Sequence, residues 1–398
     1  MNPRNLKVID RCNIHFNSIS IIKGVAPTIK VIGDSEAVLL GAPLTNDAIA
    51  KVLSLKIDAL EIFGKRLKCL SAHSAFFLLR ASVSIPRLIY FLRCAPTWRS
   101  WDKLNEYDGA LKKILESILN CELGKEAWSQ SSLPVRDGGL GMRHAVDMAL
   151  PCFLASAHSV LPLVNSLLPP NLRETDEALE EALDLRHGLP HPEAALRGSQ
   201  EEWEKPIVEA TIKTLYLQAP TDQDKARLLA LRQPGAGDWL YAVPSPQLGT
   251  LLDDESFRVI SSLRLGGQVC QPHHCPCGEK VCERGYHGLK CKKSRGRRSR
   301  HEAVNDIISR ALRTAEVPNV REPPGCSRED GKKPDGLTLI PWTRGRSLVW
   351  DFTCSDTLCP TYVTQTAQNP GAAARWRSPK RKGNTVFWRT VSFLLLLL

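Results

Sequence analysis

The sequence predicts a multidomain protein with a mostly helical N-terminal region and a small α/β domain near its C-terminus. The helical region is predicted because, from Asp47 onward, apolar residues recur every three or four positions, as on one face of a helix. The α/β domain is predicted because residues 333–340 and 347–353 are strand-like runs on either side of a polar turn. With 398 residues and 43% hydrophobic composition, the chain is long enough for two or three packed domains.

The N-terminal region divides into two parts. Residues 1–45 hold short segments rich in Ile and Val, so we expect the edge of a sheet there. Residues 46–165 predict a helical domain in which Pro86 marks a break. A Gly-rich turn at 137–141 precedes the last helix of this domain, which we expect at 145–164.

The composition changes after this domain. Residues 166–206 are rich in proline and predict a linker with one acidic helix. Helical patterning returns from residue 207 to residue 268, and this connector should end with Gly266 as a helix C-cap. The remaining predicted segments are a metal-binding loop with a basic run (269–300), an α/β domain (301–374) and a tail (375–398).

The overall charge indicates what the protein binds. A net charge of +11 and a pI near 9.1 favour a polyanionic partner, because each phosphate neutralised by Lys or Arg releases condensed counterions. We therefore expect DNA and/or RNA as the partner, with no small-molecule substrate. The alternative is a basic protein without such a partner.

Cysteine usage and the chain ends bear on the compartment. The chain has thirteen cysteines, and its first ten residues lack the continuous apolar stretch of a secretory signal, so we expect a nuclear or cytoplasmic protein that is not secreted. Residues 391–398 are apolar, but a membrane-spanning helix needs about 20 residues. No membrane partner is therefore expected.

The strongest local signal is a group of cysteines and a histidine around a Gly-containing turn. Thiolate and imidazole donors suit tetrahedral Zn²⁺, which can stabilise a segment too small to form its own core. We expect a structural zinc held by Cys275, Cys277, His287 and Cys291. Because the Cys-x-Cys spacing is tighter than usual, four neighbours remain alternative ligands: Cys270, His273, His274 and Cys282. A reactive cysteine cluster without metal is the rival interpretation.

A basic run without an acidic residue follows this group. Its members are Lys290, Lys292, Lys293, Arg295, Arg297, Arg298 and Arg300. Cations fixed beside a rigid module lose little entropy when they meet phosphates, so we predict a clamp on nucleic-acid backbone. A nuclear localisation signal and a solvated charge run are the alternatives.

Two aspartates lie in the predicted hairpin. Asp335 stands at the start of one strand and Asp351 near the middle of the other, so their carboxylates could together hold Mg²⁺ and activate water against a phosphodiester. The helix predicted around residues 300–308 offers Glu302 as a possible third ligand or support. The alternative interpretation is a pair of unrelated surface carboxylates.

These motifs stand in a fixed order over residues 237–374. Its members are Trp239, Leu240, Pro244, Ser245, Cys275, Cys277, His287, Cys291, Gly296, Arg297, Arg300, His301, Asn305, Asp306, Glu322, Pro323, Pro334, Asp335, Gly336, Trp350 and Asp351. In this order they resemble the zinc-knuckle and restriction-like endonuclease region of retrotransposon polyproteins related to non-LTR elements. The resemblance implies a PD-(D/E)xK-type fold with Asp335 and Asp351 as catalytic residues.

The N-terminal half is similar to a reverse-transcriptase thumb. The similarity rests on the opening residues Asn2 and Pro3, on residues 39–43, which resemble the last palm strands, and on residues 133–141, which resemble the end of the thumb. It implies that residues 1–45 are a remnant of the palm and that the polymerase residues that bind Mg²⁺ lie upstream of Met1. We therefore expect no polymerase activity from this chain.

The end of the chain departs from the endonuclease family. There a Lys-x-x-Lys-Tyr helix follows the second aspartate, whereas here residues 375–382 lead into an apolar tail. We hypothesise a frameshift near residue 374, which would make Lys380 a chance residue with at most a supporting role. Because the lysine stabilises developing charge in such sites, the nuclease is expected to be impaired.

The expected function is that of a retrotransposon polyprotein fragment that binds nucleic acid. The first alternative is an active Mg²⁺-dependent endonuclease that nicks DNA. The second is a degenerate open reading frame whose product does nothing.

Overall fold

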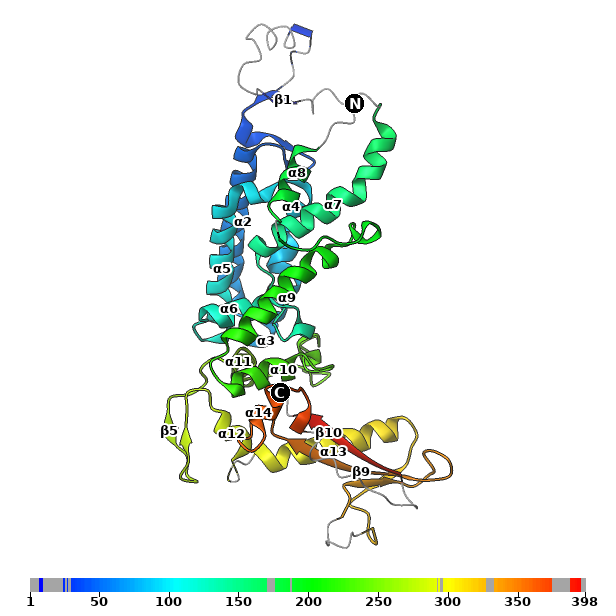
Figure 1. The fold of residues 1–398 in the computed structure, drawn as a ribbon. Helices are drawn as coiled ribbons and strands as arrows, with labels where there is room; N and C mark the ends of the chain where they lie inside the picture. The colour runs from blue at the N-terminus through cyan, green and yellow to red at the C-terminus, as the bar shows by residue number, and fades with distance from the viewer. Residues whose placement is uncertain are drawn as a thin grey trace. The chain divides into compact units, whose positions relative to one another are not determined.

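The computed structural model describes residues 7–9, 24–25, 27, 30–169, 176–186, 188–291, 293, 296–326, 333–373 and 387–394 (Figure 1). The chain forms two compact units. Unit 1 comprises Met1–Pro134, Gly139–Thr214 and Ala242–Arg258. Unit 2 comprises Val135–Gly138, Leu215–Tyr241 and Val259–Leu398. The coarse prediction is confirmed, since helices dominate and a small four-stranded sheet lies in the C-terminal half.

Unit 1 is built mainly from helices. They are α2 (Asn46–Leu67), α3 (Ala72–Leu78), α4 (Ile89–Cys94), α5 (Trp101–Leu119), α6 (Lys125–Ser132), α7 (Ala145–Leu167) and α8 (Glu177–Asp184). Thr45 begins α2, because its side chain accepts a hydrogen bond from the backbone N–H of Ala48. The predicted break at Pro86 is confirmed: a 3-10 turn, Ile85–Arg87, interrupts the chain between α3 and α4.

The extended segments before α2 form two short pieces of sheet. β1 (Lys7–Ile9) pairs in parallel with β2 (Lys30–Ile32), and β3 (Val38–Leu39) pairs antiparallel with β4 (Ala42–Pro43). The prediction of extended structure in this part of the chain is thus confirmed for the residues that the structure describes.

The core of unit 1 lies between its long helices. α2 packs along α5, and α4 packs along α7. Apolar side chains from these helices are fully buried, among them Leu53, Leu60, Leu111, Leu115 and Leu154. A second cluster forms around Trp98 and Phe153, whose rings meet edge to face with centroids 4.8 Å apart. The burial of these apolar side chains therefore stabilises unit 1.

A buried aspartate fixes the start of α7. The two carboxylate oxygens of Asp108, on α5, accept hydrogen bonds from the backbone N–H groups of Ala145 (2.7 Å) and Val146 (3.1 Å). These N–H groups have no partner within the helix, so Asp108 acts as a cap from another element. Burial raises the pKa of the Asp108 carboxyl to about 6.

The predicted Gly-rich turn before α7 is also confirmed. The backbone N–H of Gly141 donates to the carbonyl of Leu133 over 2.9 Å, which folds the segment back on itself. A Cβ at Gly139 would lie 2.1 Å from the same carbonyl, so this position requires glycine.

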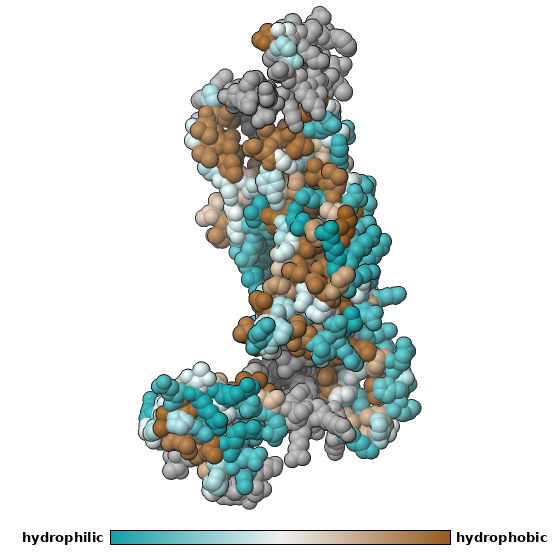
Figure 2. All heavy atoms as spheres, turned by 180° about the vertical axis from the view of Figure 1, so that it is seen from behind, coloured by the Kyte–Doolittle hydropathy of each residue, from teal (hydrophilic) through white to brown (hydrophobic). Residues whose placement is uncertain are grey.

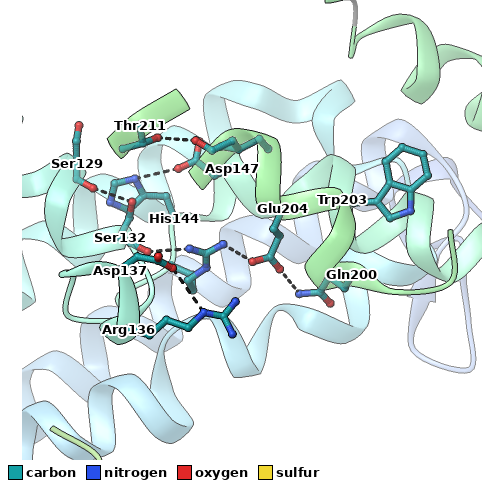
Figure 3. Close-up of polar contacts among 12 residues, drawn as sticks. Ser129, Ser132, Arg136, Asp137, His144, Asp147, Gln200, Trp203, Glu204 and Thr211 are labelled. Carbon is teal, nitrogen blue, oxygen red and sulfur yellow. Dashed lines mark hydrogen bonds and ion pairs between the residues drawn. The ribbon is translucent and has the colours of Figure 1, made fainter. Parts of the chain in front are cut away.

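The predicted linker is shorter than expected, because α9 (Gln200–Gln218) begins before Pro206. The start of this helix predicted at residue 207 is therefore wrong. Glu204 on this early turn pairs with Arg143 and accepts a hydrogen bond from Gln200 over 2.6 Å (Figure 3). This tertiary contact offsets the loss of one helical hydrogen bond at the proline.

Two stretches of unit 1 are long and apolar enough to cross a membrane by length and composition. They are Ala72–Cys94 and Ala145–Leu167. In an apolar stretch of 18 residues within each, 44% and 39% is buried, respectively. Core helices of soluble proteins pass the same test, and Phe76 and Leu154 belong to the core of unit 1. At the end of α7, Leu163 and Leu167 are exposed. On the face of the molecule drawn in Figure 2, apolar residues lie among polar ones.

Unit 2 combines helices with short strands. They are α10 (Asp222–Leu231), β5 (His273–His274), β6 (Lys280–Val281), α12 (Tyr286–Lys290), α13 (Gly296–Thr314), β7 (Asn319–Arg321), β8 (Gly336–Thr338), β9 (Leu348–Ser355), α14 (Val363–Thr366) and β10 (Phe387–Leu394). α9 and α11 (Asp254–Leu265) contribute residues to both units. As predicted, α11 ends at a glycine in the left-handed region, Gly266, with φ of +72°.

The larger sheet has the strand order β10-β9-β8-β7 (Figure 1, orange to red). β8 pairs antiparallel with β9, so the predicted hairpin is confirmed. β7 was not predicted, and neither was β10, a strand in the tail that pairs in parallel with β9. Gly336 is required in β8, because a Cβ there would lie 2.0 Å from the indole ring of Trp350.

Candidate metal centre and carboxylate pair

A tight hairpin presents the first two ligands of the candidate metal centre. β5 pairs antiparallel with β6, and the turn between them contains Cys275 and Cys277. The backbone N–H of Cys275 donates to the carbonyl of Glu279 over 2.9 Å, and that of Gly278 donates to Cys275 over 2.8 Å. Gly278 has φ of +94°, a conformation that only glycine adopts without strain.

The other two ligands lie on or next to α12. His287 is the second residue of this helix, and Cys291 follows its last residue. The Sγ atoms of Cys275 and Cys291 are 3.7 Å apart, and the Sγ of Cys277 lies 3.2 Å from the Nε2 of His287.

All four predicted ligand atoms lie within 4.8 Å of one another, so the cluster could hold a metal such as zinc. Three thiols and one imidazole form one of the usual donor sets of closed tetrahedral zinc sites. The backbone N–H of Lys293 and the neighbouring ligands lower the pKa of the Cys291 thiol to about 7. A lowered pKa favours the thiolate, which is the form that binds metal.

The alternative ligands lie outside this cluster in the part of the chain that the structure describes. The thiol of Cys270 donates to the carbonyl of Cys282 over 3.3 Å, and burial raises its pKa. The side chains of His273 and His274 are exposed on β5. The predicted set Cys275, Cys277, His287 and Cys291 is therefore the one that the structure brings together.

The basic run lies next to the cluster. Lys293 is exposed, and its Nζ donates to the carbonyl of Pro276 over 2.8 Å, beside the first two ligands. Lys290 ends α12, whereas Arg297, Arg298 and Arg300 lie in the first turns of α13. Lys292 and Arg295 lie outside the described residues.

The carboxylate pair lies at the β8–β9 hairpin. In the register, Gly336 pairs with Trp350, so Asp335 and Asp351 are the next opposed positions. Burial raises the pKa of the Asp335 carboxyl, and the Asp351 carboxylate raises it further. The predicted proximity of these two residues thus agrees with the structure.

A histidine that sequence reasoning did not assign to the site contacts Asp335. The Nε2 of His301, on α13, lies 3.3 Å from the Oδ2 of Asp335, which also accepts a hydrogen bond from the backbone N–H of Phe352 over 2.5 Å.

Hydrogen bonds determine the proton position on this histidine. The indole N–H of Trp350 can only donate, so the oxygen of the Asn305 amide must face it, at 3.2 Å. The amide nitrogen of Asn305 then donates to the Nδ1 of His301 over 3.3 Å. The proton of a neutral His301 therefore lies on Nε2 and points at Asp335. The signal in the sequence was the four-residue spacing of His301 and Asn305 on one helix face.

Glu302, one of the two predicted supporting residues, has a different partner. Glu302 forms an ion pair with Arg321 of β7. Since β7 was not predicted from the sequence, this ion pair could not be predicted either. Glu302 as a third ligand is thus not supported by its contacts. Lys380 lies outside the described residues.

No protein-family model and no curated protein matches the sequence. The site must therefore be interpreted from its own residues.

Proposed function

We propose that this chain is a nucleic-acid-binding fragment of a retrotransposon polyprotein, whose Cys3His cluster holds zinc and whose basic run contacts phosphates. The observation that carries the proposal is the cluster itself, in which four ligand atoms lie within 4.8 Å of one another. Closed Cys3His sites stabilise small loops and leave no open coordination position for catalysis. The function of such a loop then depends on what it positions.

The residues that follow the last ligand support nucleic acid as the partner. The basic run begins at the end of α12 and continues into the first turns of α13. The N-terminus of a helix carries partial positive charge, so it adds to the attraction of the cationic side chains for phosphate. The net charge of +11 acts in the same direction at longer range.

Fluorescence anisotropy with labelled DNA and RNA of equal length tests the proposal. Replacing Lys292, Lys293, Arg295 and Arg297 by Gln should weaken binding and lower the slope of log K against log salt by about 0.9 for each phosphate of duplex DNA that the variant no longer neutralises. The matched control replaces four exposed lysines of unit 1: Lys65, Lys68, Lys113 and Lys125. An equal weakening in both variants would contradict a clamp at the basic run.

A second candidate function is Mg²⁺-dependent nicking of DNA. The opposed positions of Asp335 and Asp351, with His301 beside them, favour it. The two carboxylates would hold the metal, which would activate water and offset charge on the phosphodiester. Plasmid nicking by the zinc-loaded chain with Mg²⁺ should be lost in Asp335→Ala and in Asp351→Ala. Nicking retained by both variants would exclude this candidate.

A further inference from the structure

The metal loop is attached to the rest of unit 2 by an ion pair. Asp224 lies in the first turn of α10 and is buried. Its Oδ2 accepts a hydrogen bond from the hydroxyl of Thr221 over 2.6 Å, and its Oδ1 pairs with the guanidinium of Arg284. Both oxygens of this carboxylate are therefore engaged, one by its own helix and the other by the metal loop.

Arg284 stands at the point where the loop turns into α12. The next residue, Gly285, has φ of +64°, and its backbone N–H donates to the carbonyl of Cys282 over 2.9 Å. α12 begins directly afterwards and carries His287. The position of Arg284 thus fixes where the helix starts and where the imidazole ligand lies.

The two faces of α12 contact different parts of unit 2. Tyr286 is buried in a cluster with Ala226 of α10 and Leu263 of α11, and Leu289 packs against the same cluster. These two residues are three positions apart, so they share one face of the helix. His287 belongs to the metal cluster. The same short helix therefore joins the metal to the core.

Charge makes the carboxylate of Asp224 difficult to replace. The guanidinium of Arg227, which is buried, interacts electrostatically with both Asp224 and Arg284. Removing the negative charge of Asp224 would leave two cations facing one another, and breaking a buried pair in this way is strongly unfavourable. The loop would then shift away from α10.

We propose that Asp224 is a positioning residue for the metal centre and sets its affinity through Arg284, although it is not itself a ligand. The inference rests on metal binding by the cluster in the proposed function. Metal binding holds α12 from one side, and the Asp224–Arg284 pair holds it from the other. Such a linkage is reciprocal. If bound metal strengthens the Asp224–Arg284 pair by some factor, the intact pair must strengthen metal binding by the same factor.

The experiment measures Zn²⁺ affinity by competition with a chromogenic chelator. Asp224→Asn and Arg284→Gln should each lower the affinity about tenfold or more, as for other groups that orient metal ligands. The matched control is Asp222→Asn, which removes the same charge from an exposed position of the same helix turn and should leave the affinity unchanged. Far-UV circular dichroism at saturating Zn²⁺ verifies that the helices remain.

A double variant separates positioning from general destabilisation. If Asp224 acts through Arg284, Asp224→Asn combined with Arg284→Gln should lose little more affinity than either change alone. Additive losses, or wild-type affinity in a folded Asp224→Asn chain, would overturn the inference. If Asp224→Asn does not fold, Arg284→Gln carries the test, because that side chain is partly exposed. A wild-type chain that binds no Zn²⁺ would contradict the metal centre itself.

Discussion

The two units of this protein are stabilised by different means. In unit 1, long helices bury large apolar side chains such as Leu53, Leu115 and Leu154. In the metal loop of unit 2, few apolar side chains are buried, chiefly Val281 and Tyr286, and the loop is tied by thiols, an imidazole and the Asp224–Arg284 pair. The comparison teaches that apolar burial stabilises the first, whereas the second has an ion pair and, in our proposal, a bound metal in place of a large apolar core.

Metal removal should have the largest effect, and it should loosen the metal loop of unit 2 while leaving unit 1 unchanged. Chelation removes a binding free energy that is on the order of 10 kcal/mol in isolated zinc fingers. We expect hydrogen exchange to rise in α12 and α10 and to stay unchanged in α5. Cys275→Ser should reproduce this result, whereas Cys270→Ser, a thiol outside the cluster, should not. Equal protection of α12 with and without metal would contradict the comparison.

A cavity in the core of unit 1 should lower the stability of that unit and leave metal binding unchanged. Leu154→Ala removes a fully buried side chain from α7 and should lower the free energy of unfolding by about 2–5 kcal/mol. Leu163→Ala, on the same helix but 60% exposed, is the matched control and should change it by less than about 0.5 kcal/mol. Denaturant unfolding measures both. Zn²⁺ affinity should be the same in both variants, and a lower affinity with Leu154→Ala would mean that the units are not independent.

The pH dependence of unit 1 should reveal the buried cap of α7. Burial raises the pKa of Asp108 from 3.8 to about 6, so the folded state binds a proton more tightly than the unfolded state. The contribution of this carboxyl is therefore greatest below about pH 4 and is lost as the pH rises through about 6.

The free energy of unfolding of the wild type, minus that of Asp108→Asn, should accordingly fall over this range by up to about 3 kcal/mol. Urea unfolding at a series of pH values measures the difference, in which titration of other groups cancels. A difference that rises with pH would mean that the two N–H donors outweigh burial.

The smallest effect is expected at the Glu302–Arg321 pair. Its side chains are 50% and 32% exposed, and such pairs contribute about 0–1 kcal/mol. Glu302→Gln should therefore leave thermal unfolding nearly unchanged and should not alter any Mg²⁺-dependent nicking, in contrast to Asp351→Asn. Loss of nicking in Glu302→Gln would instead support Glu302 as the third Mg²⁺ ligand that the sequence suggested.

Local chemistry explains which features could be predicted. The four metal ligands were identified because sulfur and imidazole donors around a glycine turn have few other uses. The end of α11 was also predicted, because Gly266 follows it as a C-cap. In both cases, the residues that decide the structure are close together in the sequence.

Long-range contacts explain what could not be predicted. β7 has three residues, and only its pairing with β8 makes it a strand. The first turns of α9 form an ion pair with Arg143, which is far away in the sequence. The contact between His301 and Asp335 likewise joins α13 to the start of β8. No local pattern in the sequence shows which distant residue each of these elements contacts.

The most direct measurement of the central claim is the DNA affinity of the chain with and without metal at one fixed salt concentration. We predict that the Zn²⁺-loaded protein binds duplex DNA, that chelation or Cys277→Ser weakens binding at least tenfold, and that added Zn²⁺ restores only the chelated wild type. Equal affinity of the loaded and chelated chains, in a protein shown to have lost its metal, would contradict a metal-stabilised nucleic-acid clamp.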